Sequence, residues 1–522
     1  MAGDITGYDR RVSTDVAGDG GQAGASSGDV AIAPPTRASV ARGVSWQALA
    51  AVIGQGAWYA SLFVLAVLLS PRDFGVVAVA SAAVSVLMLV LESGISGALI
   101  ITKDLDAGSV WRALARTSLA GCVATGLFVA LAGPLASAFS GGSGADVIRV
   151  IAVTVALASV AIVPNALLMR NLRFKAASQI TIAAAVVASA AAIVAAALGA
   201  GVWALAIRLL VNQALIATLA FSAARDLLPR RPPRGTAVAR TAGSRAFFVI
   251  AAANALAWTC DNLVVGASTD TTRLGLYSFA FSLAFLPLTQ VSWAVGQVVL
   301  PAVAAARDKD VVQAMTLSAV RVMALALLPV VPVAVALAPG VIPAILGHRW
   351  TGTVVIFQIL VGAGVGYGVL NILAEALAGA GARSASTRAR IDASWALLTI
   401  AAIAAGVRLD GIRGAAIAHL ITCAVLGAAY VWRGGAAVGL SAGALVGAVR
   451  RVCLCVLIQG AATAGVMLAL EAASVGALGS GIAAAVAGVA ALMGALWALA
   501  PDTLREAQHT VAAALGRRAS GG

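Results

Sequence analysis

Charged side chains are scarce in this chain of 522 residues, and their scarcity excludes a water-soluble fold. Asp, Glu, Lys and Arg make up 11% of the sequence, whereas soluble domains average about a quarter. Hydrophobic residues make up 61%, and they form long runs of the kind that cross a bilayer as helices. The composition therefore predicts an all-α polytopic membrane protein.

Cysteine, histidine and lysine are also rare, which excludes several kinds of chemistry. The five cysteines lie in or beside apolar runs, and Cys453 and Cys455 have no second Cys or His cluster to complete a metal site. The three lysines, Lys103, Lys175 and Lys309, lie outside the Gly-rich phosphate-binding context of an ATPase. We expect no metal, no cofactor and no ATP hydrolysis, so energy must come from an ion gradient, substrate supply or a partner.

The basic residues that are present are distributed unevenly. When the apolar runs are taken as spans, 28 basic residues lie in the two tails and in alternate connections. The intervening connections carry only Arg72, Arg149, Arg273, Arg349, Arg408 and Arg413. Because basic loops stay in the cytoplasm, both termini are expected there. The net charge of +14 is dispersed without aromatic interleaving, so no nucleic-acid partner is expected.

About fourteen apolar runs are long enough to be transmembrane helices. They cover residues 45–69, 75–100, 115–138, 147–169, 178–199, 203–222, 246–267, 275–299, 316–338, 353–376, 391–407, 413–432, 450–471 and 479–499. The predicted organisation is a disordered cytoplasmic tail (1–42), a six-helix lobe (43–224), a cytoplasmic linker (225–245), a second six-helix lobe (246–439), two extra helices (440–500) and a cytoplasmic tail (501–522).

Related segments recur in the two lobes. Leu69–Gly75 resembles Thr269–Gly275 with an offset of 200, and Gly201 precedes span six as Gly411 precedes span twelve, with an offset of 210. Each match is weak alone, but the two offsets are similar. Because six spans is an even number, the two repeats have the same orientation, as in the parallel-repeat design of some transporters. The last two spans lie outside the repeat.

Several longer motifs identify a family. They are Leu68–Ala78 (LLSPRDFGVVA), Glu92–Ile100 (ESGISGALI), Val163–Lys175 (VPNALLMRNLRFK), Cys260–Gly266 (CDNLVVG) and Ile345–Trp350 (ILGHRW). With these motifs the sequence resembles the polysaccharide transporter family of oligosaccharide flippases, in the multidrug/oligosaccharidyl-lipid/polysaccharide exporter superfamily. The resemblance covers about residues 43–439.

The resemblance implies two six-helix repeats around a central cavity, in a transporter of the bacterial cytoplasmic (inner) membrane rather than an enzyme. It implies an undecaprenyl-diphosphate-linked oligosaccharide as cargo, moved between leaflets by alternating access. Membrane lipids are implied as partners, and contacts with a polysaccharide polymerase and a chain-length regulator are left open. The family often has Asp where this chain has Glu92, and it has no universal substrate residues that can be carried over.

Ionisable groups inside spans are costly and are therefore functional candidates. Arg208 and Asp261 both lie roughly 8–10 Å from the outer surface, at 1.5 Å per helical residue. Arg208 is a candidate to bind diphosphate, and Asp261 to compete for it or to accept a coupling proton. A structural ion pair or a snorkelling arginine is the alternative. Glu92 is a candidate for proton or sodium binding, or for capping a kink, and Glu375 for gating or for simple solvation.

Polar side chains in the second lobe are candidates to bind sugar hydroxyls. These are Asn262, Gln290, Gln297 and Asn371. Hydrogen bonding between helices is the alternative for all of them. His419 is a lone histidine in a span, where a packed residue is more common than a proton carrier.

Three other functions remain open. A membrane polysaccharide polymerase would concentrate charge in a large outer loop, and the outer loops here are short and nearly uncharged. A drug antiporter for cations predicts an acidic cavity, whereas the embedded charges are mixed. A peptidoglycan-precursor flippase would share every feature above. Its gene would be essential, so a viable deletion would argue against this function.

Overall fold

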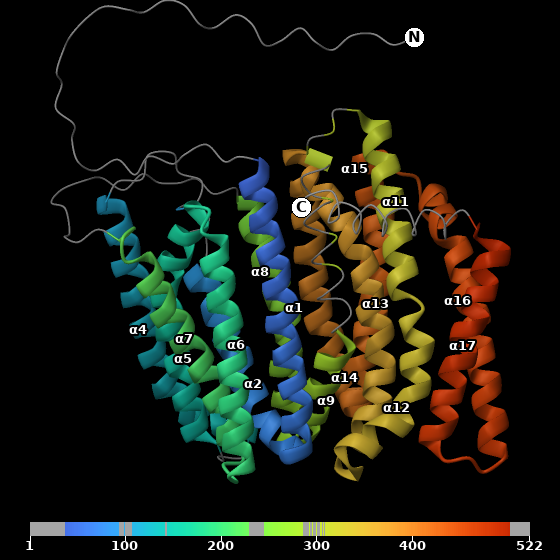
Figure 1. The fold of residues 1–522 in the computed structure, drawn as a ribbon, viewed down its shortest axis with the longest axis horizontal. Helices are drawn as coiled ribbons and strands as arrows, with labels where there is room; N and C mark the ends of the chain where they lie inside the picture. The colour runs from blue at the N-terminus through green and yellow to red at the C-terminus, as the bar shows by residue number, and fades with distance from the viewer. Residues whose placement is uncertain are drawn as a thin grey trace, which may run out of the picture. The chain divides into compact units, whose positions relative to one another are not determined.

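A chain in a bilayer must satisfy its backbone polar groups internally, and the described part of this chain does so with helices alone. The computed structural model describes residues 37–92, 107–140, 144–228, 245–285 and 308–501, with a few single residues between them. The helices, shown in Figure 1, are α1 (Arg37–Leu68), α2 (Pro71–Glu92), α4 (Ala107–Ser140), α5 (Ala145–Arg170), α6 (Phe174–Ala197), α7 (Val202–Ala224), α8 (Arg245–Ser268), α9 (Thr271–Ala284), α11 (Lys309–Leu327), α12 (Val330–Leu346), the 3₁₀ turn η1 (His348–Trp350), α13 (Thr351–Gly379), α14 (Ala382–Ala429), the π-helical turn η2 (Tyr430–Gly434), α15 (Gly435–Val438), α16 (Ala442–Ala472) and α17 (Ala477–Leu499).

Local sequence explains where several helices begin. Asp270, Asp308 and Ser441 precede α9, α11 and α16, and each side chain accepts a hydrogen bond from a backbone N–H of the first turn. The arginine Arg173 lies just before α6 and donates to Asp226, just after α7, with one contact of 2.9 Å. This hydrogen bond, together with the positive charge of Arg173, lowers the pKa of the Asp226 carboxyl.

The α1 helix begins at Arg37, inside the segment that was predicted as tail. The predicted span 316–338 is broken, because α11 ends at Leu327 and α12 begins at Val330. Pro329 lies at the break and has no N–H to continue the helical ladder. The predicted spans 391–407 and 413–432 are the two arms of α14, which reverses at Asp410 and Gly411.

Ten segments among the described residues are long and apolar enough to cross a membrane. One of them contains both arms of α14, and another contains α11 and α12 together. The all-helical multi-span fold is thus confirmed, whereas the count of fourteen spans and the domain boundaries stay predictions.

Helix pairs recur along the chain as the repeat predicted. In the first helix group (α1–α7), α1 packs on α6 and α2 packs on α5; in the second helix group (α8–α15), α8 packs on α14 and α9 packs on α13. The helices α16 and α17 pack on each other and against α11 and α12. The two extra helices therefore cover one side of the second group (Figure 1).

The up-and-down order of the helices gathers the sparsely charged connections at one end of the bundle. We call this the low-charge end: it contains the α1–α2, α6–α7, α8–α9 and α16–α17 connections, η1, and the reversal of α14. It is the lower end in Figure 1. The opposite end contains the connection between α5 and α6, with Arg170, Arg173 and Lys175. We call it the basic end.

Candidate functional site

Arg208 is buried on α7, with 2% of its surface exposed. Its guanidinium carbon lies 3.4 Å from the centre of the Trp58 ring on α1, and Nη2 donates to the Trp58 carbonyl at 3.4 Å. The Nε atom has no hydrogen-bond partner, and no carboxylate within the described ranges forms an ion pair with Arg208. A buried cation held by a π face and a carbonyl keeps its charge free for an anion.

Asp261 is fully buried on α8 and faces a second titratable group. Its Oδ2 lies 3.8 Å from Nε2 of His419 on α14, and its Oδ1 accepts a hydrogen bond from the Asn262 N–H at 2.7 Å. The Tyr277 hydroxyl on α9 interacts electrostatically with the same carboxylate. Asp261 Oδ2, both His419 ring nitrogens and the Tyr277 hydroxyl lack a hydrogen-bond partner within the described ranges.

An aromatic shell surrounds this Asp261–His419 pair. The ring of His419 lies 5.6 Å from that of Phe281, 6.3 Å from that of Phe285 and 6.4 Å from that of Tyr367. The Tyr367 hydroxyl donates to the His419 carbonyl at 3.2 Å, which fixes the backbone of α14. Burying a carboxylate in such an apolar shell is costly without a polar partner, and the His419 ring is the neighbouring polar group.

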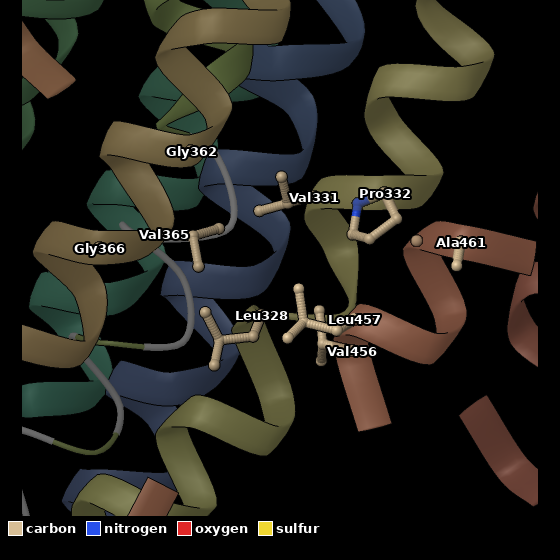
Figure 2. Close-up of a pocket in the computed structure, with 10 residues that line it drawn as sticks. Leu328, Val331, Pro332, Gly362, Val365, Gly366, Val456, Leu457 and Ala461 are labelled. Carbon is tan, nitrogen blue, oxygen red and sulfur yellow. The ribbon is translucent and has the colours of Figure 1, made fainter. Parts of the chain in front are cut away.

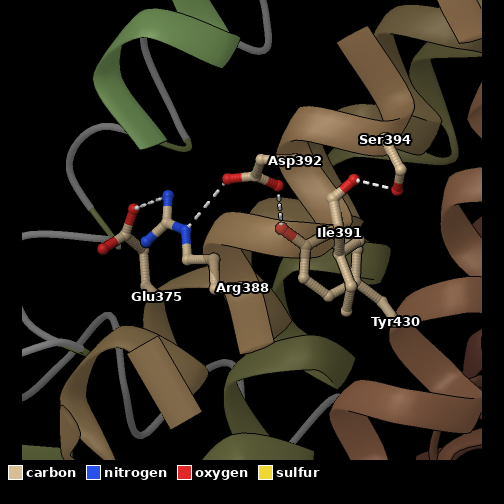
Figure 3. A network of polar contacts seen from close by, with 6 residues as sticks. All are labelled: Glu375, Arg388, Ile391, Asp392, Ser394 and Tyr430. Carbon is tan, nitrogen blue, oxygen red and sulfur yellow. Dashed lines mark hydrogen bonds and ion pairs between the residues drawn. The ribbon is translucent and has the colours of Figure 1, made fainter. Parts of the chain in front are cut away.

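Glu375 was expected to take part in gating or to be solvated, and the structure places its half-buried side chain in a polar network. Figure 3 shows Arg388 between two carboxylates: its Nη2 lies 3.3 Å from Glu375 and its Nε lies 3.4 Å from Asp392. The Tyr430 hydroxyl, at the start of η2, donates to Asp392 at 2.5 Å. Arg388 was counted among loop residues, but it lies within α14 and is buried.

This network was missed by sequence reasoning, although one signal was present. Arg388 and Asp392 are four residues apart, which places them on the same helix face. The carboxylate of Glu375 on α13 and the hydroxyl of Tyr430 come from outside that helix turn. Such partners are set by tertiary packing, so the sequence does not reveal them.

The remaining candidates are less well defined. Asn262 follows Asp261 on α8, and its side-chain oxygen is buried without a partner in the described part of the chain. Asn371 is half-buried on α13. Gln290 and Gln297 lie outside the described residues, as does the side chain of Glu92. Arg208 and Asp261 lie in different helix groups, and no ion pair among the described residues joins them.

A cavity of about 460 Å³ lies between α12, α13 and α16, near the end of α11. Figure 2 shows that its wall is apolar, with Leu328, Val331 and Pro332 facing Val456 and Leu457. Glycines at 362, 366 and 460 are also part of its wall. A cavity with this lining suits hydrocarbon rather than sugar, because buried hydroxyls would find no hydrogen-bond partners there.

The comparisons with known proteins agree with this architecture. The profile of a family described as "Polysaccharide biosynthesis protein" matches residues 64–355, which is more than half of the chain. The chain belongs to this polysaccharide biosynthesis protein family. The family assignment made from the motifs is thereby confirmed.

This member of the polysaccharide biosynthesis family is 29% identical over 175 residues to the succinoglycan biosynthesis transport protein ExoT of Rhizobium meliloti (strain 1021). The alignment covers 33% of this chain and 35% of that protein, so it spans about a third of the relative's length.

Two solved structures share its fold. The lipid II flippase MurJ in an inward closed conformation matches with a TM-score of 0.67 and 12% identity, covering 87% of this chain and 100% of that one. An inward-facing multidrug resistance transporter of the MATE family, in the MOP superfamily, matches with a TM-score of 0.56 and 16% identity, covering 75% and 96%. At these identities the likeness shows the fold alone. The family member described here is thus a multi-span membrane protein with a transporter fold.

Proposed function

We propose that this protein is a flippase that moves an undecaprenyl-diphosphate-linked oligosaccharide across the cytoplasmic membrane for the synthesis of a surface or secreted polysaccharide. Three observations support the proposal: the polysaccharide biosynthesis family, a relative named as a succinoglycan transport protein, and a fold shared with a lipid II flippase. Membrane lipids contact the apolar surface, and a polysaccharide polymerase and chain-length regulator are the proposed downstream partners.

The single observation that carries the proposal is the state of Arg208. An arginine in a transmembrane helix is costly unless its charge has a use, and this one has no carboxylate partner in the described part of the chain. A diphosphate is a suitable anion, because a guanidinium presents its N–H groups in a fork that matches phosphate oxygens. The stacked Trp58 ring holds the guanidinium plane in place without neutralising it.

Energy for the cycle comes, in this proposal, from a proton carried by the Asp261–His419 pair. Aromatic rings surround the pair, and its polar atoms lack hydrogen-bond partners within the described ranges, which leaves them available to a transported proton. Protonation of such a pair is a local event that can bias the packing of α8 against α14. Asn262, Gln290, Gln297 and Asn371 remain candidates for sugar contacts, and Glu92 a second candidate for the coupling ion.

The other functions fit less well. An antiporter for cationic drugs needs an acidic site for its cargo, whereas the buried charge described on α7, Arg208, is positive. A peptidoglycan-precursor flippase has the support of the fold, and the decisive observation is genetic. If deletion of the gene is viable and abolishes a surface polymer, the peptidoglycan function is excluded.

Replacement of Arg208 tests the proposal directly. We expect Arg208→Gln to lower polymer export by about ten- to a hundredfold, since hydrogen bonds to charged groups contribute roughly 1.5–3 kcal/mol each. Arg208→Lys should retain part of the activity, because it keeps the charge but loses the fork geometry. Export is measured in a deletion strain complemented with each variant at matched membrane levels.

The matched control is Arg408→Gln, which removes an exposed arginine from the second group. Transport of radiolabelled lipid-linked repeat units between leaflets separates a flippase from a polymerase, because a polymerase would lengthen the glycan. Full export by Arg208→Gln at normal levels would remove Arg208 from the mechanism and leave the proposal without its main support.

A further inference from the structure

The two helix groups meet mainly through α2, which packs on α8 and α9, and part of this contact lies at the low-charge end, where α1 is followed by α2 and α8 by α9. Phe74 of α2 packs edge-on against Phe279 of α9, with ring centres 5.6 Å apart, and against Trp350 of η1, at 5.3 Å. One apolar cluster there includes residues of α1, α2, α9, α12 and η1. The two groups are therefore joined at this end by a dry, aromatic contact.

Two glycines bring the helices into direct backbone contact. A β-carbon on Gly75 would lie 1.8 Å from the Thr271 carbonyl oxygen, and a β-carbon on Gly275 would lie 1.7 Å from the Pro71 carbonyl oxygen. The two contacts are equivalent in the two repeats, because Gly275 lies 200 positions after Gly75 and Thr271 lies 200 positions after Pro71. Only glycine allows this approach, so any larger residue must push α2 and α9 apart.

The end of α1 leaves two carbonyl groups without helical partners. The Ser70 N–H, which would bond the Ala66 carbonyl, donates to Asp73 Oδ2 at 2.9 Å instead. The Val67 carbonyl would need the N–H of residue 71, which is a proline and has none. The sequence Ser-Pro-x-Asp after α1 therefore leaves the Ala66 and Val67 carbonyl oxygens in need of hydrogen-bond donors from outside the helix.

The second helix group supplies the missing donors. Trp350 Nε1 donates to the Ala66 carbonyl at 2.9 Å, and Arg349 Nη2 donates to the Val67 carbonyl. Trp350 is fully buried in this position, and the positive charge of Arg349 lies at the negative end of the α1 dipole. All donors come from η1, a single turn between α12 and α13.

We infer that Gly75, Gly275, Arg349 and Trp350 form a latch that holds the two helix groups together at the low-charge end, and that its release is a step of the transport cycle. The latch is suited to reversal: when η1 withdraws, water at the membrane surface can replace the Trp350 and Arg349 hydrogen bonds to α1. A disulfide or a fully apolar core would not allow such an exchange. The inference rests on the proposed function only in linking release to transport, and the latch can be tested without cargo.

The test measures access of water to the contact. Leu69, at the end of α1, is 3% exposed and belongs to the joined cluster. In purified protein in lipid nanodiscs, modification of Leu69→Cys by a water-soluble maleimide is followed by mass spectrometry of the Leu69 peptide. We expect slow modification in the parent. Adding Trp350→Ala should accelerate it roughly five- to tenfold, as loss of one buried hydrogen bond shifts a two-state equilibrium. Gly75→Ala or Gly275→Ala should accelerate it by a similar factor, because the added β-carbon pushes α2 and α9 apart.

Two controls separate release of the latch from general loosening. Gly56→Ala adds a β-carbon on α1 where nothing lies within 4 Å, and it should leave the rate unchanged. Leu198→Cys lies at the same end and is 82% exposed, so its rate should stay constant in every variant. Trp350→Phe keeps the ring but removes the donor, and should give an intermediate rate.

An unchanged Leu69→Cys rate in both Gly75→Ala and Trp350→Ala would overturn the latch. If a variant fails to accumulate, Trp350→Phe and Arg349→Gln decide the question, and no acceleration in these two would also overturn it. Polymer export by the same variants is measured separately. Accelerated modification together with unaffected export would uphold the latch and contradict its role in transport, whereas failure of the Arg208 experiment would contradict the cargo alone.

Discussion

Buried charges in the two helix groups have different surroundings, and these decide what each can do. Arg208 has a ring and a carbonyl beside it, whereas Asp261 faces a histidine, a tyrosine hydroxyl and an aromatic shell. A cation without a carboxylate partner among the described residues is suited to bind an anion. A carboxylate beside an imidazole is suited to bind and release a proton. The two residues therefore divide cargo binding and energy coupling between them in the proposed cycle.

Asp261→Asn tests the coupling step alone. The amide has the shape of a protonated carboxyl group, so we expect the variant to fold and to bind cargo but to lose the stimulation of transport by a pH gradient. Transport of lipid-linked oligosaccharide into proteoliposomes should fall about tenfold or more with the gradient imposed, in line with removal of a proton carrier. His419→Gln should give the same loss of stimulation, because the proposed proton site includes both side chains.

The control for this measurement is Glu471→Gln, which removes an exposed carboxylate from α16. Undiminished pH-gradient stimulation in Asp261→Asn, with Glu471→Gln also unaffected, would exclude Asp261 from the coupling step. The idea of a proton on this pair would then be abandoned.

At the residue scale, the sequence shows that a charge is embedded but not what lies beside it. Arg208 and Asp261 stand out because a charge in an apolar run is rare. The partners Trp58 and His419 are 150 and 158 positions away along the chain, and no local pattern connects them. Arg388 was misplaced for the same reason: its partner Glu375 neutralises it inside the structure, so a residue read as a loop cation lies buried.

At the element scale, apolar length predicted most helices, while their internal breaks depend on single residues. Gly411, where α14 reverses, has a positive φ of 53°. The two arms of α14 then touch through Gly406 and Gly414. A β-carbon on Gly414 would lie 1.9 Å from the Gly406 carbonyl oxygen. With 55 glycines in the chain, the sequence does not mark this pair, because close approach is a property of the folded hairpin.

Gly414→Ala should therefore destabilise the hairpin. Overpacking of this kind costs about 1–3 kcal/mol, and here the neighbour is backbone, which cannot rotate away. We expect a lower thermal midpoint for purified Gly414→Ala in detergent, followed by intrinsic tryptophan fluorescence. Gly447→Ala, on α16 with nothing within 4 Å, is the matched control and should melt as the parent does. Equal midpoints for the two variants would contradict the close contact.

At the scale of the whole molecule, the repeat was predicted from weak matches and the structure gives it a physical basis. Gly75 and Gly275 are 200 positions apart, and each makes the same close backbone contact with the opposite helix group. The central cavity stays a prediction, because its size depends on how far the two helix groups separate, and no sequence pattern encodes a distance between helices. One cavity that the described residues do line lies between α12, α13 and α16.

Parallel repeats require both helix groups to face the same way, and this can be tested in cells. Leu198 and Leu409 are exposed at the low-charge end, one in each group, and Asp226 and Val311 are exposed at the basic end. Because basic connections are retained in the cytoplasm, we expect cysteines at 198 and 409 to react with a membrane-impermeant maleimide in intact cells. Cysteines at 226 and 311 should react only after permeabilisation. Reaction of the cysteines at 198 and 409 from opposite sides of the membrane would show that the two repeats are inverted. A latch at one end could then not close a cleft shared by both helix groups.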